Sequence, residues 1–180
     1  MATLTAPNSI PDFEHEYHTV IIDNLDHSSN TDFTTYLPTP LENIVQAQLV
    51  AATIATSGDA QRVLHIDIEE LRSRNTQRAC ATTGNSDTPW AASADNHLDH
   101  AFASIMCQHE LIANGGAQKA VFFRNEYPII HQYQNPIRKL DRLTFNIDKQ
   151  DGSTAAMGAS VFVFKFVCKN RNLPFAPAGR

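Results

Sequence analysis

Hydrophobic and polar residues alternate along much of the chain with a period of two, which is typical of β-strands. The strictest case is residues 63–68, where Leu64, Ile66 and Ile68 are expected to face a core and the polar residues between them to face outward. The same alternation predicts strands at residues 17–23, 33–37, 44–54, 120–123, 127–133, 140–148 and 160–168. Residues 98–107 fit a helix and a strand equally, so their pattern does not decide between the two.

Prolines and turn residues set the expected ends of these strands. Pro38 and Pro40 follow residues 33–37, and proline supplies no N–H to a β-ladder, so the second strand is expected to stop there. In the next segment, 44–54, Val45, Ala47, Leu49 and Ala51 alternate with Gln46, Gln48 and Val50, which is the period of a half-buried strand. Its Ala, Leu and Gln residues also suit a helix. The prolines before it and the β-branched residues at its end favour a strand.

The end of the chain has the most distinctive pattern. Phe162, Phe164 and Phe166 alternate with mainly aliphatic residues, which indicates a strand covered on both faces. Its expected partner is residues 140–148, where Leu143, Phe145 and Ile147 are expected to face the core and the residues between them to face water. Asp151-Gly152-Ser153 supplies turn chemistry between the two segments. The sequence therefore predicts a closing antiparallel hairpin. The three phenylalanines could line a ligand pocket, but we expect them in the core.

Eight or nine short strands without βαβ alternation predict an all-β, antiparallel sandwich or barrel. The 180 residues are enough for one domain, expected at residues 14–169, with an extended N-terminal arm at 1–13 and a tail at 170–180. Residues 73–96 form a long polar loop. Its one large apolar side chain, Trp90, is a candidate partner anchor, or it pins the loop to its own domain.

Composition excludes several classes of protein. The net charge of −5 argues against non-specific nucleic-acid binding, which depends on many lysines and arginines. No apolar run approaches the ~20 residues that span a bilayer, so we expect no membrane span. Three cysteines without metal-type spacing favour free thiols in a reducing compartment. The first residues lack the features of a secretory signal and are expected to be an arm of the mature protein.

One group of residues suggests a metal site. His65 and Asp67 share one strand face, with His131 and Arg142 downstream, in an order similar to the iron ligands and co-substrate arginine of 2-oxoglutarate oxygenases. Two imidazoles and a carboxylate can hold iron and leave positions open for substrate. A solvated strand face explains the same residues, and the next acids, Glu69 and Glu70, suggest a solvated edge. The chain has no nucleophile elbow or phosphate loop. We therefore expect no enzyme activity, metal or cofactor.

Several blocks, in order, resemble the jelly-roll minor capsid and penton-type proteins of large icosahedral double-stranded DNA viruses, over about residues 17–168. The most specific block is Asn135-Pro136-Ile137-x-x-Leu140-Asp141-Arg142-Leu143-Thr144 with Glu126-Tyr127-Pro128 upstream. The others are Tyr17 to Asp23, Phe33, Leu37-Pro38-x-Pro40-Leu41 with Asn43, Leu64 to Leu71, and Ala101 to Ile105. The polar loop at 73–96 and the run His97 to His100 depart from the family pattern.

The resemblance implies a single jelly roll of about eight strands with an architectural role in a capsid. The implied partners are the major capsid protein and other minor capsid proteins, with self-association into a pentamer if the chain occupies a vertex. The implied location is the virion, after assembly in host cytoplasm. A lectin-like attachment module is the second interpretation, and an iron- and 2-oxoglutarate-dependent oxygenase the third.

Asp141 and Arg142 follow the turn at Pro136 and stand at the entrance of a predicted strand. We expect their charges to tie this loop to a neighbouring segment, which is a structural role. The polar face of the same strand, from Arg142 to Asp148, is expected to be free for another chain.

Overall fold

The computed structural model describes residues 14–57, 63–72, 101–106, 109–111, 118–149, 154–155 and 157–170. Within them lie seven strands and one short 3-10 turn. The strands are β1 (His15–Asp23), β2 (Asp32–Ser57), β3 (Val63–Ile68), β4 (Ala103–Met106), β5 (His109–Leu111), β6 (Gln118–Lys149) and β7 (Met157–Lys169), and the turn is η1 (Glu69–Leu71). The predicted arm at 1–13, the loop at 73–96 with Trp90, and residues 171–180 of the predicted tail lie outside the described residues.

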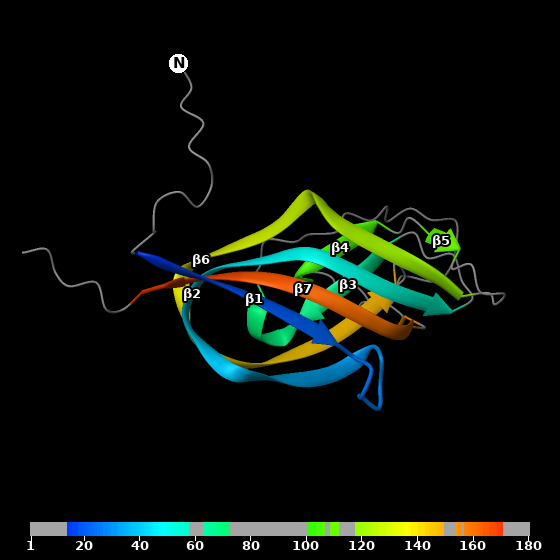
Figure 1. Cartoon of the computed structure of the whole chain (residues 1–180), viewed down its shortest axis with the longest axis horizontal. Coiled ribbons are helices and arrows are strands. Elements are labelled where there is room, and N and C mark those ends of the chain that lie inside the picture. The colour runs from blue at the N-terminus through cyan, green and yellow to red at the C-terminus, as the bar shows by residue number, and fades with distance from the viewer. Residues whose placement is uncertain are drawn as a thin grey trace, which may run out of the picture.

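The strands form one antiparallel sheet in the order β1-β7-β2-β6-β3-β4, and β5 adds a short pairing to β6. Figure 1 shows this sheet curling, because β2 and β6 run together to one end of the molecule and turn back. The prediction of an all-β, antiparallel protein is confirmed. β4 also resolves the ambiguous segment near residue 100, because residues 103–106 form a strand.

β2 and β6 are far longer than predicted, with 26 and 32 residues. They pair from Asp32↔Asn146 to Ser57↔Gln118, and the ladder is interrupted at three places where four residues of one strand lie opposite one of the other. These four-residue segments are 37–40 in β2 and 125–128 and 133–136 in β6, and each contains proline. Proline is tolerated there because no ladder N–H is required. The prediction that proline ends the strands is therefore wrong, although it does interrupt pairing.

The turning point of β2 contains Asn43, which has a positive φ of 54°. Asparagine tolerates this left-handed conformation better than most residues. Asn43 lies between the pairs Glu42↔Lys139 and Ile44↔Ile137, so the ribbon of β2 and β6 remains paired as it turns.

The core fills the inside of the curl. Phe162, Phe164 and Phe166 of β7 are fully buried, as expected of core residues. Phe145 of β6 packs against Phe162 and Phe164, with ring centroids 5.4 and 6.0 Å apart. Leu143 and Ile147, on the same face as Phe145, are also fully buried.

The predicted closing hairpin is wrong. β7 pairs with β1 and with residues 44–56 of β2, whereas residues 140–148 of β6 pair with β2 and β3. Both segments bury aromatic rings in one core, so they face each other instead of lying side by side. β7 does occupy an interior position in the sheet, but its second face is open at Val161 and Lys165, so the expected cover on both faces is absent there.

Two predictions of strand faces also need correction. In β2, Ala47 and Leu49 are buried as expected, but the interruption after Leu49 shifts the phase, so that Ala52 rather than Ala51 is buried. In β3, Leu64, Ile66 and Ile68 face the core as predicted. The residues between them, expected to face water, are buried as well, because β3 is covered on both sides.

Candidate functional site

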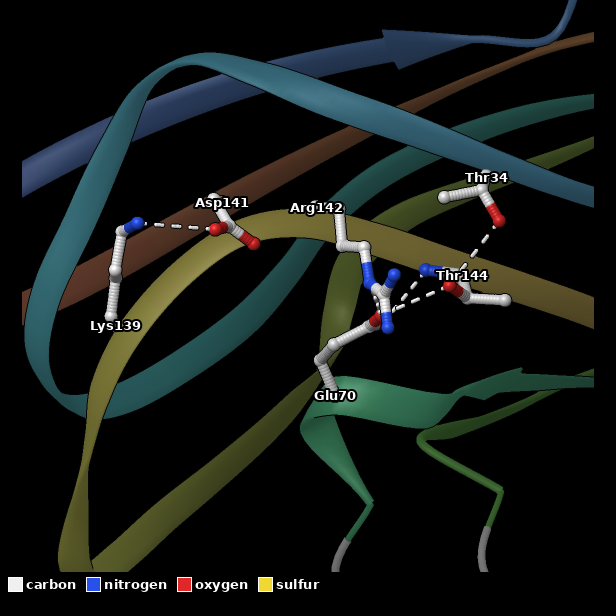
Figure 2. Close-up of polar contacts among 6 residues, drawn as sticks. All are labelled: Thr34, Glu70, Lys139, Asp141, Arg142 and Thr144. Atoms are coloured by element: carbon white, nitrogen blue, oxygen red, sulfur yellow. Dashed lines mark hydrogen bonds and ion pairs between the residues drawn. The ribbon is translucent and has the colours of Figure 1, made fainter.

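The predicted motif around Arg142 lies where β6 has passed its turn and pairs with the first half of β2. The backbone register places Arg142 opposite Tyr36 and Thr144 opposite Thr34. The Thr34 hydroxyl donates to the Thr144 hydroxyl at 3.3 Å. The turn η1, which follows β3, approaches the same stretch of β6 and brings Glu70 to it (Figure 2).

Glu70 is the acceptor at the centre of this cluster. Its carboxylate accepts hydrogen bonds from the Thr144 backbone N–H at 2.7 Å, the Thr144 hydroxyl at 2.9 Å and Arg142 Nε at 3.2 Å. The Glu70 side chain is only 18% exposed, whereas that of Arg142 is 52% exposed. The two hydrogen bonds from Thr144 to Glu70 are therefore better shielded from water than the ion pair with Arg142. We expect them to contribute more to the stability of the fold.

Asp141 points toward a different partner. Its carboxylate pairs with Lys139 at 3.2 Å, and both side chains are more than half exposed (Figure 2). Such a pair contributes little to stability. Arg142 ties β6 to η1, which is the kind of contact that the sequence suggested, but Asp141 contacts its own strand. Arg142 and Thr144 are engaged by Glu70, so that part of the polar face is not free for another chain.

A second carboxylate fixes the other end of η1. Asp67 accepts hydrogen bonds on both oxygens from Arg72 Nε, each at 3.1 Å. The hydrogen bond to Asp67 is the main cause that raises the pKa of Arg72, against the opposing effect of burial. The Tyr133 hydroxyl donates to the Leu71 carbonyl at 3.1 Å, and burial raises the pKa of Tyr133 well above its usual range. η1 is thus held by β3 and by both halves of β6.

The two histidines of the suggested metal site have separate partners. His65 Nδ1 lies 2.9 Å from the Ser104 hydroxyl of β4. His131 Nε2–H donates to the Phe102 carbonyl at 2.6 Å, and its ring lies 4.5 Å from that of Phe102. Burial lowers the pKa of His131, partly offset by the Phe102 carbonyl.

The structure does not bring His65, Asp67 and His131 together. In the part of the chain that the structure describes, no group of three or more His, Cys, Asp or Glu side chains could hold a metal ion. Arg142, the suggested co-substrate arginine, pairs with Glu70 instead. The described residues therefore offer no geometry from which a step of oxygenase chemistry could be derived.

A shallow groove lies on the outer face of the sheet, and sequence reasoning did not identify it. Polar and aromatic side chains of four neighbouring strands line it, mainly Tyr17, Gln46, Gln48, Gln132, Gln134 and Lys165. Two of these glutamines had been assigned to the outward face of residues 44–54. Alternation could not show that they lie beside Gln132, Gln134 and Lys165, which are more than 80 positions away in the sequence. That proximity depends on the pairing of β2 with β6 and β7.

No protein-family model matches the chain, and a comparison with curated proteins found no match. The described residues also contain no helix long and apolar enough to cross a membrane.

Proposed function

We propose that this protein is a jelly-roll structural subunit of an icosahedral viral capsid, either a minor capsid protein or a penton. The observation that carries the proposal is the order of strand segments. If β2 and β6 are each divided at their common turn, eight segments result. One set is β1, β7, residues 44–57 and residues 118–132, and the other is residues 32–41, residues 137–149, β3 and β4.

A jelly roll has eight strands in two sheets, and the arrangement of two sets of four antiparallel segments around one core supports its assignment to this chain. The ring contacts of Phe145 with Phe162 and Phe164 join residues 137–149 of one set to β7 of the other. Jelly rolls occur in capsid subunits and also in lectins and cupins, so the fold alone does not select the function. The resemblance in sequence to capsid proteins favours the first class.

The outer surface carries apolar side chains that a shell subunit could place against neighbours. Ile21 of β1 is 69% exposed and Val161 of β7 is 39% exposed. Register places both on one face, since Ile21 is opposite Val163 and Asp23 is opposite Val161. Ala51 of β2 continues the row beyond Val163. Exposed apolar side chains grouped on one face can serve as protein contacts, here with the major capsid protein, other minor capsid proteins or copies of this chain.

The polar contacts of η1 suit an architectural role. Glu70 and Asp67 fix η1 against β6 and β3 with charged hydrogen bonds, and the contact of Glu70 with Thr144 joins segments far apart in sequence. A rigid subunit loses little conformational freedom when it docks, and this favours assembly. The proposed partners, the virion location and assembly in host cytoplasm follow from the same assignment.

Incorporation into particles tests the proposal. A tagged copy of the full chain is expressed in cells infected by the virus from which the sequence comes, and icosahedral particles are purified on density gradients. We expect the tagged chain at a fixed ratio to the major shell protein. The double variant Ile21→Ser/Val161→Ser should be folded but incorporated at least fivefold less.

Tyr36→Ser serves as the matched control, because Tyr36 is 72% exposed but lies on the other set of segments. Absence of the unmodified tagged chain from purified particles would overturn the proposal. Equal incorporation of the double variant would overturn the assignment of the Ile21 face as a contact.

A further inference from the structure

The outer face formed by β1, β7, β2 and β6 has two adjacent rows of side chains that cross all four strands. The first row is Tyr17, Val167, Gln46 and Gln132, and the second is Thr19, Lys165, Gln48 and Ile130. Neighbouring strands lie about 4.8 Å apart, so each row is about 14 Å long. The rows therefore form an elongated surface across the strands.

A groove with a volume of about 670 Å³ lies along these rows. That volume is in the range of ligand sites, and the groove is open to solvent. Its floor is rigid, because the backbones of β7 and β2 are paired on both sides. At this floor a ligand is recognised mainly through side chains, because the ladder hydrogen bonds of β7 and β2 are already paired.

The lining has a specific chemical character. Gln46, Gln48, Gln132 and Gln134 contribute four side-chain amides, each with donors and an acceptor. Tyr17 is 56% exposed and offers an aromatic ring beside them. Lys165 Nζ lies 4.9 Å from the centre of that ring, which holds the ammonium group at the groove. The lining includes no carboxylate.

These properties narrow the class of ligand. An apolar molecule would desolvate the amides without replacing their hydrogen bonds. A nucleic acid would need several lysines or arginines, whereas Lys165 is the one such residue among those that line the groove. Hydroxyl groups, which both donate and accept, match amide side chains, and an aromatic ring can pack against the C–H face of a sugar. An acidic group would be placed beside Lys165.

We propose that this groove binds an oligosaccharide that carries a carboxylate or sulfate, with the acidic sugar at Lys165. The groove lies on the same outer face as the Ile21 row, next to it, and Tyr133 of its lining contacts η1 through the Leu71 carbonyl. The inference rests on the side chains that line the groove and not on the proposed capsid role. The groove gives the outer face of this protein a binding activity of its own.

Binding is tested on the full chain by calorimetry and by NMR chemical-shift perturbation with three probes. These are a hyaluronan tetrasaccharide, which alternates glucuronate and N-acetylglucosamine, chitotetraose as its neutral counterpart, and tetraglutamate as an acidic peptide. We expect the hyaluronan tetrasaccharide to bind at least fivefold more tightly than chitotetraose and to shift Gln46, Gln132 and Lys165. Tetraglutamate should not bind measurably.

Single substitutions test which side chain of the groove recognises which part of the sugar. Lys165→Gln should lower affinity for the hyaluronan tetrasaccharide at least fivefold and leave chitotetraose unchanged, whereas Tyr17→Ala should weaken both sugars. Lys139→Gln and Tyr36→Ala are the matched controls, because both residues are exposed and lie outside the groove. The proposal is overturned if neither sugar binds, if the shifts map elsewhere, or if tetraglutamate binds as well as the acidic sugar.

Discussion

The carboxylate of Glu70 accepts a 2.7 Å hydrogen bond from the backbone N–H of Thr144, 74 residues further along the chain. This contact joins η1 to β6, and the Thr144 hydroxyl and Arg142 add two more donors to the same carboxylate. Because the Glu70 carboxylate is largely buried and accepts three hydrogen bonds, removing it should destabilise the protein. Of the three contacts, the ion pair with Arg142 is the most exposed.

Glu70→Ala should therefore destabilise the protein more than Arg142→Ala. We expect a loss of about 2 to 3 kcal/mol for Glu70→Ala, because charged hydrogen bonds are lost and a backbone N–H loses its acceptor. For Arg142→Ala we expect about 0.5 kcal/mol, as for other exposed ion pairs. Urea unfolding of the three proteins measures the difference.

Lys139→Ala is the control for these two variants, since it removes an exposed pair with Asp141. Its free energy of unfolding should stay within about 0.5 kcal/mol of the unmodified protein. A larger loss for Arg142→Ala than for Glu70→Ala would contradict the assignment of Glu70 as the central acceptor.

The packing of Phe145 against Phe162 predicts energetic coupling between β6 and β7. Each Phe→Leu change should cost about 1 to 3 kcal/mol, which is common for a core substitution. A double-mutant cycle should give a coupling of about 0.5 to 1.5 kcal/mol, the range for aromatic pairs. The pair Phe33 and Phe166 serves as a control, because both rings are buried but make no ring contact with each other among the described residues. Equal coupling in both pairs would count against the packing described.

His131 should make stability depend on pH. Burial lowers its pKa in the folded protein below the ordinary value of about 6.5, so folding favours the neutral ring. Its contribution is fully present above pH ~6.5 and is lost as pH falls from there through the folded pKa. Unfolding of the unmodified protein and His131→Gln between pH 8 and 5 should show the unmodified protein losing more stability. A pH-independent difference between the two would refute this.

The thiol of Cys168 should be unreactive in the folded protein. Burial raises its pKa to about 11, and the charge of Glu16 acts in the same direction. Because the thiolate is the reactive form, modification by DTNB at pH 8 should be at least tenfold slower in the folded protein than in urea. Measurements in a Cys80→Ser/Cys107→Ser background isolate this thiol. Equal rates in both states would show that Cys168 is accessible.

Alternation in the sequence predicted the short strands well and the long ones poorly. β1 and β3 lie close to the segments that the alternation predicted, and the core-facing residues of β3 were identified correctly. In β2 and β6, prolines were interpreted as strand ends. Instead, each proline lies in a four-residue segment that faces a single residue of the partner strand. The paired strands β2 and β6 continue beyond Pro38, Pro40, Pro128 and Pro136.

Burial patterns identify which face of a strand is covered, but not which strand covers it. The phenylalanines of β7 and Phe145 of β6 were correctly expected in the core, yet their strands face each other instead of pairing. The same limit applies to β3. Alternating polar residues suggested a wet face, although Ser104 and Arg72 provide partners that allow His65 and Asp67 to be buried.

The candidate site was predicted in part. Arg142 and its role as a tie between segments followed from its place after the turn at Pro136. Glu70, the partner, had been interpreted as part of a solvated edge because it follows Glu69 in a polar run. The sequence does not distinguish the roles of Glu69 and Glu70. They differ because η1 lies against β6, where the Glu70 carboxylate reaches Thr144 and Arg142.

The most direct test of the proposed capsid role is a cryo-EM reconstruction of purified icosahedral particles, with the described part of this chain fitted as a rigid body. The account predicts density for the curled sheet at a defined lattice position, in fivefold rings at the vertices or between capsomers, with the Ile21 and Val161 face against a neighbouring subunit. A well-resolved shell in which every density is explained by other chains would contradict it.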